Sequence, residues 1–158
     1  MEKVGDFLYG DLWECSPEIL KDAAKLTEIV LEAAKRAWVE VQSHAFHPNS
    51  HGGVDGVVVI AESHLIIHTF PELGVALVDV FTCGAKAQPW EALLYIPSEL
   101  GAAVTRPLAQ LPRPYLGRKG VILSREEILQ MLQGVNPTKV DEVVSLEQAS
   151  PATTSPRP

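Results

Sequence analysis

The stretch from Ala61 to Glu72 holds a serine, two histidines and two glutamates in an otherwise apolar region, and Cys83 follows shortly after it. A serine hydroxyl can attack the carbonyl carbon of the preceding residue if the fold strains that peptide and stabilises the oxyanion. Elimination from the resulting ester would cut the chain before Ser63 and leave dehydroalanine, which hydrolyses to a pyruvoyl group. This self-cleavage needs a nearby proton carrier, and the imidazole of His68 can serve as one.

The spacing between Ser63 and His68 sets a condition on this chemistry. An offset of five residues puts the two side chains on opposite faces of a flat strand. Action of His68 on Ser63 within one chain therefore requires a bend or bulge near Ser63. The other residues also have ordinary interpretations: Cys83 as a small buried hydrophobe, Glu72 as a solvated turn residue and Phe70 as part of the core.

Runs of branched and aromatic residues predict the strands that position this stretch. The central strands carry apolar residues at successive positions, as in 57–60, which is typical of burial on both faces. The predicted strands span residues 4–13, 39–41, 56–62, 65–70, 75–82 and 102–108.

Two helices should cover one face of the sheet. Ser16 as N-cap and Pro17 at the first helical position predict a helix start, and apolar residues continue at helical spacing as far as Trp38. A second helix is predicted over 89–100, where Pro97 should kink it or end it early. We therefore expect an α+β fold: a two-layer α/β sandwich with a largely antiparallel sheet and helices on one face. A second copy of the chain could cover the other face.

The 158 residues predict one domain over 1–136, including a small helix that starts at Ser124, and a disordered tail over 137–158. The net charge of −7, without a basic cluster, disfavours nucleic acid as a partner, and the apolar runs are too short to cross a membrane. Cys15 and Cys83 are expected to be reduced thiols in a cytoplasmic protein.

Several motifs together resemble the prokaryotic S-adenosylmethionine decarboxylase proenzymes, over about residues 4–108. The motifs are Glu62-Ser63-His64, Ile67-His68-Thr69, Pro71-Glu72 and Val78-Asp79-Val80-Phe81-Thr82-Cys83-Gly84. The resemblance implies the fold of that family and autocatalytic cleavage between Glu62 and Ser63, which gives a β chain of residues 1–62 and an α chain that begins at residue 63.

The same resemblance implies the roles of the site residues. Ser63 becomes the pyruvoyl cofactor, whose ketone forms a Schiff base with the substrate amine and accepts the electrons released with CO₂. No metal takes part. His68 is the proton carrier of self-processing, Cys83 reprotonates the α-carbon, and the small-molecule substrate contacts Glu72, Phe70 and Leu65. The enzyme would act as a homodimer of αβ protomers, and its product would serve spermidine biosynthesis.

Four positions depart from the family pattern. Asn49 replaces an aromatic or apolar residue, Leu73 and Val75 stand where tyrosines are common, and Asp55 replaces a serine that assists processing. Less aromatic surface weakens stacking on a purine, and a carboxylate cannot act as a hydroxyl donor.

These departures leave alternatives open. A thinner aromatic clamp and an added carboxylate would suit arginine or ornithine, which other members of the family decarboxylate with the same pyruvoyl group. A catalytically silent homologue, unprocessed because of Asp55, could serve as a dimerisation partner. A metal-binding module is a third alternative, based on His44 and on His47 and His51 in the polar loop predicted over 47–53.

Overall fold

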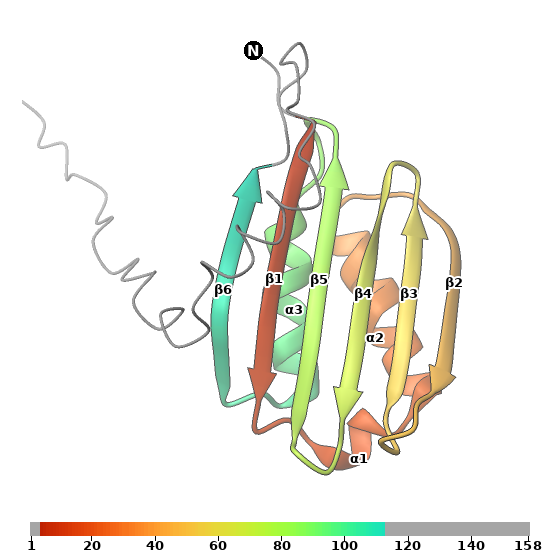
Figure 1. Cartoon of the computed structure of the whole chain (residues 1–158). Coiled ribbons are helices and arrows are strands. Elements are labelled where there is room, and N and C mark those ends of the chain that lie inside the picture. The colour runs from red at the N-terminus through yellow and green to blue at the C-terminus, as the bar shows by residue number, and fades with distance from the viewer. Residues whose placement is uncertain (1–3, 113–158) are drawn as a thin grey trace, which may run out of the picture. The chain divides into compact units, whose positions relative to one another are not determined.

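A six-stranded antiparallel sheet with helices on one face forms the part of the chain that the computed structural model describes, residues 4–112 (Figure 1). The strands follow the order β2-β3-β4-β5-β1-β6 across the sheet. They are β1 (Gly5–Trp13), β2 (Val41–Pro48), β3 (Val54–Ile60), β4 (Ser63–Phe70), β5 (Val75–Cys83) and β6 (Val104–Pro112). The expected two-layer α+β fold is confirmed.

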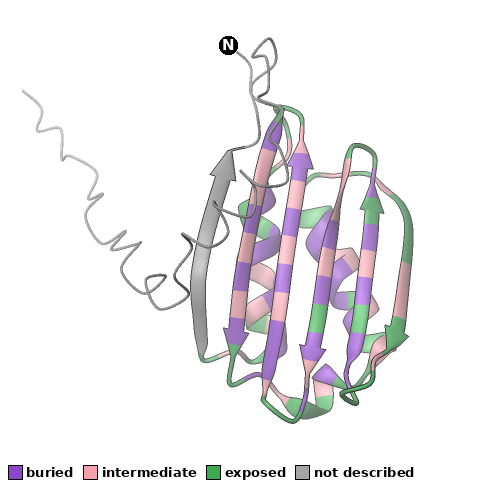
Figure 2. Ribbon diagram, viewed as in Figure 1, coloured by how far each residue is buried: buried purple, intermediate pink, exposed green. Residues whose placement is uncertain are grey.

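The residues of the central strands alternate between the two faces of the sheet, as Figure 2 shows by the alternating colours along each strand. In β4, Leu65 and Ile67 are fully buried on the helix-covered face, whereas Ile66 and His68 point the other way. We call this second side the open face. Its residues on β1, β3, β4 and β5 are Phe7, Tyr9, Asp11, Asp55, Val57, Val59, His64, Ile66, His68, Phe70, Leu77, Asp79, Phe81 and Cys83.

The core lies between the sheet and α2 (Ala23–Arg36) and α3 (Pro89–Leu100), both of which run behind the sheet in Figure 1. Apolar residues at helical spacing bury one stripe of each helix. The buried residues of the two helices are Leu26, Ile29, Val30, Ala33, Ala34, Ala92, Leu93, Ile96 and Leu100. This packing fixes the helix-covered face and leaves the open face without a second layer among the described residues.

The prediction of one long first helix is wrong. The structure has a single turn, α1 (Pro17–Leu20), followed by a separate α2. Asp22 starts the new helix, because its carboxylate accepts a hydrogen bond from the Lys25 amide at 2.9 Å. The predicted N-cap Ser16 makes no side-chain capping bond.

The predicted helix over 89–100 is confirmed as α3, and Pro97 does not end it early, since the helix continues to Leu100. Pro97 lies in the last turn, where little helix remains to be disturbed. Gly101 then closes the helix with a left-handed φ of 67°. The carbonyl of Pro97 accepts a hydrogen bond from the Ala102 amide at 3.0 Å, as is common where a glycine ends a helix.

Strand β2 is longer than expected and takes His47 and Pro48 out of the predicted polar loop, which shrinks to residues 49–53. Phe46 anchors the strand, because its ring lies against Gly56, where a Cβ would overlap it. Pro48 is tolerated since β2 is an edge strand.

The predicted small helix, the domain limit at residue 136 and the tail over 137–158 lie outside the described residues. Within residues 4–112, the helices are too short or too polar to cross a membrane.

Candidate active site

Ser63 begins β4 directly after a tight hairpin. Ile60 and Ser63 are paired across β3 and β4, so only Ala61 and Glu62 form the turn. Among the described residues, the Oγ of Ser63 is the only buried side-chain oxygen or nitrogen without a hydrogen-bond partner. A hydroxyl that is not engaged elsewhere keeps its lone pairs and its proton available for reaction at the neighbouring Glu62 carbonyl.

Cys83 lies at the same end of the sheet. Because His64 pairs with Phe81, the next residues outward bring Cys83 level with Glu62. A cavity of about 290 Å³ borders the hairpin, and its walls include Glu62, Cys83, Trp38 and Lys86. We call this region the Ser63 end of β4.

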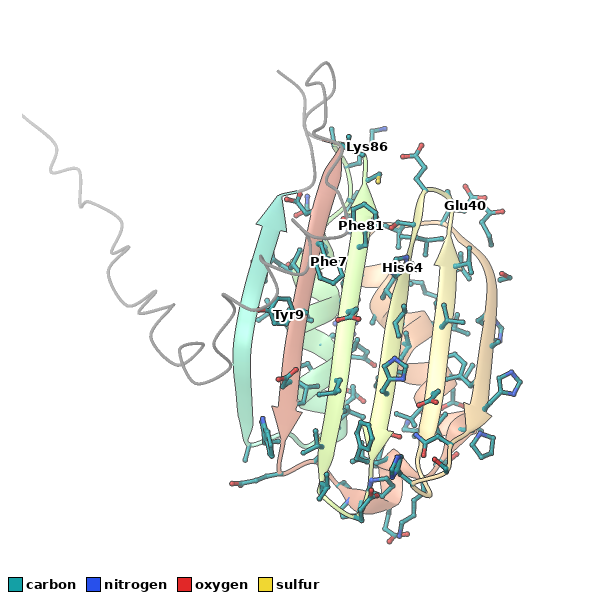
Figure 3. The ribbon with its side chains drawn as sticks, viewed as in Figure 1. Phe7, Tyr9, Glu40, His64, Phe81 and Lys86 are labelled. Atoms are coloured by element: carbon teal, nitrogen blue, oxygen red, sulfur yellow. The ribbon has the colours of Figure 1, made fainter. Side chains whose placement is uncertain are left out.

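An aromatic cluster lies on the open face next to the Ser63 end, where Figure 3 labels Phe7, Phe81 and His64 side by side. Phe81 makes edge contacts with His64 at 5.8 Å and with Phe7 at 6.5 Å between ring centroids. Neither Phe7 nor Phe81 was predicted as a site residue. Their alternation with buried residues in β1 and β5 was the available signal.

His68 lies further along β4 and pairs in register with Asp55 on β3. Its Nδ1 is 3.1 Å from Asp55 Oδ1. The side-chain amide of Asn49 donates to the same carboxylate oxygen at 3.0 Å. The hydrogen bonds from Asn49 and from His68, in that order of importance, lower the pKa of Asp55 below its usual value.

His51 contacts both Glu72 and Phe70 at this end of β4. The Nδ1 of His51 is 3.6 Å from Glu72 Oε1, and its ring centroid is 5.3 Å from that of Phe70. We call the region of His68, Asp55, Phe70 and Glu72 the His68 end of β4.

The bend required near Ser63 is absent, so that expectation is corrected. The register of β4 with β3 and β5 runs without a shift from one end of the strand to the other. Five residues of regular strand separate Ser63 from His68 by about 16 Å, on opposite faces. The structure therefore brings Cys83 close to Ser63 but does not bring His68 to either of them within one chain.

Leu65 is a second correction. It is 0% exposed and packs in the core between sheet and helices, so it offers no surface to a substrate. Side chains alternate between the two faces along β4, and the position of Leu65 puts it on the helix-covered face.

The loop histidines do not converge. Within residues 4–112, no group of three or more histidine, cysteine, aspartate or glutamate side chains is arranged to hold a metal ion. The two thiols also differ: Cys15 is buried, which raises its pKa, while Cys83 is partly exposed.

The described residues form a two-layer α+β domain with an unpartnered serine directly after a hairpin turn, a thiol at the same end of the sheet and an acid–imidazole cluster further along it. Residues 6–110 match the sequence profile described as S-adenosylmethionine decarboxylase. The chain belongs to the S-adenosylmethionine decarboxylase family.

Individual relatives agree. The chain is 48% identical over 103 residues to an S-adenosylmethionine decarboxylase proenzyme of Moorella thermoacetica, covering 65% of this chain and 82% of that protein. It is 47% identical over 102 residues to the proenzyme of Carboxydothermus hydrogenoformans, covering 65% and 80%. The crystal structure of the adenosylmethionine decarboxylase from Aquifex aeolicus superposes with a TM-score of 0.68 at 26% identity and covers 77% of this chain and all of that one.

Proposed function

We propose that the chain is a pyruvoyl-dependent S-adenosylmethionine decarboxylase that cuts itself between Glu62 and Ser63. Family membership supports the carboxy-lyase reaction on a small-molecule substrate. The observation that carries the self-cleavage is the buried, unpartnered Oγ of Ser63 at the hairpin tip. A serine at this position also fits a pyruvoyl group, which forms from the Cα, Cβ and carbonyl of Ser63 after Oγ has left with the Glu62 carboxylate.

The cleavage balances without any outside reagent except water. The Ser63 Oγ bonds to the Glu62 carbonyl carbon, the C–N bond breaks, and the hydroxyl proton ends on the nitrogen. Removal of the Ser63 Cα proton then expels the Glu62 carboxylate and leaves dehydroalanine. Hydrolysis releases ammonia and leaves the pyruvoyl group, which supplies an electron-accepting ketone for decarboxylation.

The separation of Ser63 and His68 favours a homodimer with a shared site. Two copies could join through their open faces, related by a two-fold axis perpendicular to the strands. The β4 strands of the two copies would then run in opposite directions, so that the Ser63 end of one copy faces the His68 end of the other. The partner's His68 would then reach the Glu62–Ser63 peptide from the open face and carry the proton during cleavage. The apolar and aromatic residues of the open face, including Phe7, Ile66 and Phe81, would be covered.

The remaining residues divide between the two ends of β4. Cys83 would protonate the α-carbon after CO₂ leaves, beside the group made from Ser63. Glu72 and Phe70, brought by the partner, would contact the ribose hydroxyls and the base. A reducing compartment such as the cytoplasm suits this role, because a proton-donating thiol must stay reduced.

A mixture of two inactive variants tests the proposal. Ser63→Ala and His68→Ala should each remain a single intact chain when purified alone, whereas the parent should show two chains that divide after Glu62 by mass spectrometry. In mixed dimers, the His68→Ala chain should be cut, because its Ser63 meets an intact histidine from the partner.

Cleavage of the His68→Ala chain by itself would remove His68 from the mechanism. A parent chain that stays intact after long incubation would contradict self-processing and leave the silent dimerisation partner as the better account.

One observation favours a second substrate class. Asp55 places an ionised carboxylate on the open face where the family has a hydroxyl, and Asn49 supplies an amide rather than an apolar side chain. Arginine and ornithine carry a distal cation that a carboxylate attracts. Release of CO₂ from S-adenosylmethionine, arginine and ornithine, measured side by side, decides between the classes.

A further inference from the structure

Asp55 and His68 form a close contact that the strand register imposes. They are directly opposed on β3 and β4, and the two side chains stand on the same face. The distance of 3.1 Å between Asp55 Oδ1 and His68 Nδ1 is that of a hydrogen bond. Both side chains are about half exposed, at 50% for Asp55 and 46% for His68. The pair is therefore part of the sheet geometry rather than a chance meeting of long side chains.

Asn49 holds the carboxylate from the other side. Its Nδ2 donates to Asp55 Oδ1 and to the carbonyl of Thr69, both at 3.0 Å. Its Oδ1 accepts from the amides of His51 and Gly53, also at 3.0 Å. Exchanging the oxygen and nitrogen of this side chain would put donors against donors and acceptors against acceptors, so only one orientation of Asn49 satisfies all four bonds.

The hydrogen bonds from Asn49 to Asp55 and between Asp55 and His68 determine which ring nitrogen of His68 is protonated. An ionised carboxylate can only accept hydrogen bonds, and the lowered pKa keeps Asp55 ionised at neutral pH. Neutral His68 must therefore carry its hydrogen on Nδ1 and keep its lone pair on Nε2. Nε2 has no hydrogen-bond partner among residues 4–112.

We propose that Asp55 and Asn49 are positioning residues for His68, which hold its ring so that Nε2 is the atom that exchanges the proton with the partner's Ser63. The inference rests on the proposed self-cleavage and deepens it. Asp55 would thus assist cleavage in a different way from a hydroxyl. It does not donate a proton but orients His68, which transfers one.

Several charged and titratable groups lie on the elements around His68. They are His47 on β2, Asp55 on β3, Asp79 on β5, Asp11 on β1, His51 in the loop over 49–53 and Glu72 in the turn after β4. Within the described residues, only Asp55 bonds to the His68 ring, so its removal should change the ring tautomer while removal of Asp79 should not.

The tautomer can be measured without cleavage. In the uncut Ser63→Ala protein, ¹⁵N NMR of the histidine side chains should show His68 protonated on Nδ1 at neutral pH. Adding Asp55→Asn should shift His68 towards the Nε2-protonated form or a mixture, and Asn49→Ala should do so less. Asp79→Asn, which removes the same charge from the same face, should leave the His68 signal unchanged.

The cleavage rate supplies the second readout. With Ser63 intact, Asp55→Asn should slow cleavage by about 100-fold or more, as expected when a histidine is held in the wrong tautomer. Asn49→Ala should slow it several-fold, and Asp55→Glu should restore part of the rate lost in Asp55→Asn. Thermal melting of each variant shows whether it is folded, and two independent variants guard against one misfolded protein.

The outcomes separate this inference from the proposed function. Parental cleavage rates in Asp55→Asn, or His68 protonated on Nε2 in Ser63→Ala, overturn the inference while self-cleavage stands. The parent chain could instead never cut, while His68 carries its proton on Nδ1 only when Asp55 is present. This result would confirm the hydrogen-bonded pair but overturn the processing role of His68, and with it the inference.

Discussion

The two ends of β4 hold their polar side chains in opposite ways. At the Ser63 end, the hydroxyl is buried without a hydrogen-bond partner, and the hairpin turn before it borders a cavity. At the His68 end, Asn49 and Asp55 make several hydrogen bonds that orient the imidazole. The difference follows from the chemistry that each end would perform, because a nucleophile must be available whereas a proton carrier must be correctly oriented.

Loss of the Cys83 thiol tests the Ser63 end and should have a large effect on turnover. Cys83→Ala should still be cut, but it should decarboxylate about 100- to 10,000-fold more slowly, because a proton donor is lost from the reacting centre. Mass spectrometry measures the cut and CO₂ release the turnover.

Cys15→Ala is the matched control, since it removes a thiol that is only 3% exposed and far from the hairpin in sequence. It should lower the free energy of unfolding by about 1 kcal/mol and leave turnover unchanged. An equal loss of turnover in both variants would contradict the role of Cys83 as proton donor.

A stability effect tests the His68 end. The hydroxyl of Thr69 is buried, accepts from the Val54 amide at 2.7 Å and donates to the Leu20 carbonyl at 2.8 Å. Thr69→Val leaves both backbone groups unsatisfied and should lower the free energy of unfolding by about 1–3 kcal/mol, measured by denaturant unfolding. Thr27→Val removes a hydroxyl that only bonds back within α2 and should change stability much less.

A smaller gain is expected beside the Ser63 end. Trp38 is 76% exposed and has a φ of 59°. This left-handed conformation favours glycine, so Trp38→Gly should raise the free energy of unfolding by about 1 kcal/mol, because strain is removed and little packing is lost. Ala37→Gly, next to it and in the ordinary right-handed helical conformation, should instead destabilise the protein. A loss of stability in Trp38→Gly would show that the indole makes stabilising contacts in solution.

A still smaller effect is expected at Asp11 on β1, which the register places level with His68. Burial first, and then the charge of Asp79, raise the pKa of Asp11. The native state thus holds the proton more tightly than the unfolded chain, so stability falls as pH rises from the usual pKa through the raised one and stays lower above it. Asp11→Asn should remove this dependence and raise stability at pH 7 by less than about 1 kcal/mol.

Thermal melts across the acid range check this sign. Asp79→Asn removes only the lesser cause and should give a smaller change in the same direction. Unchanged pH dependence in Asp11→Asn would assign it to other groups.

The reactive groups and the faces on which they lie could be predicted from the amino-acid sequence. The alternation of residues in β4 already put Ser63 and His68 on opposite sides of a strand, and the motif around Ser63 indicated the family. The alternation also placed Leu65 among the buried residues, although resemblance had assigned it to the substrate.

How these groups meet depends on the folded structure and could not be predicted from the sequence. A regular strand without a bulge separates Ser63 from His68, and this distance is what calls for a second copy. The grouping of Asn49, Asp55 and His68 depends on the register between β3 and β4 and on the loop before β3. Local periodicity is written along the chain, but register is set by turns and by packing between segments that are far apart in the sequence.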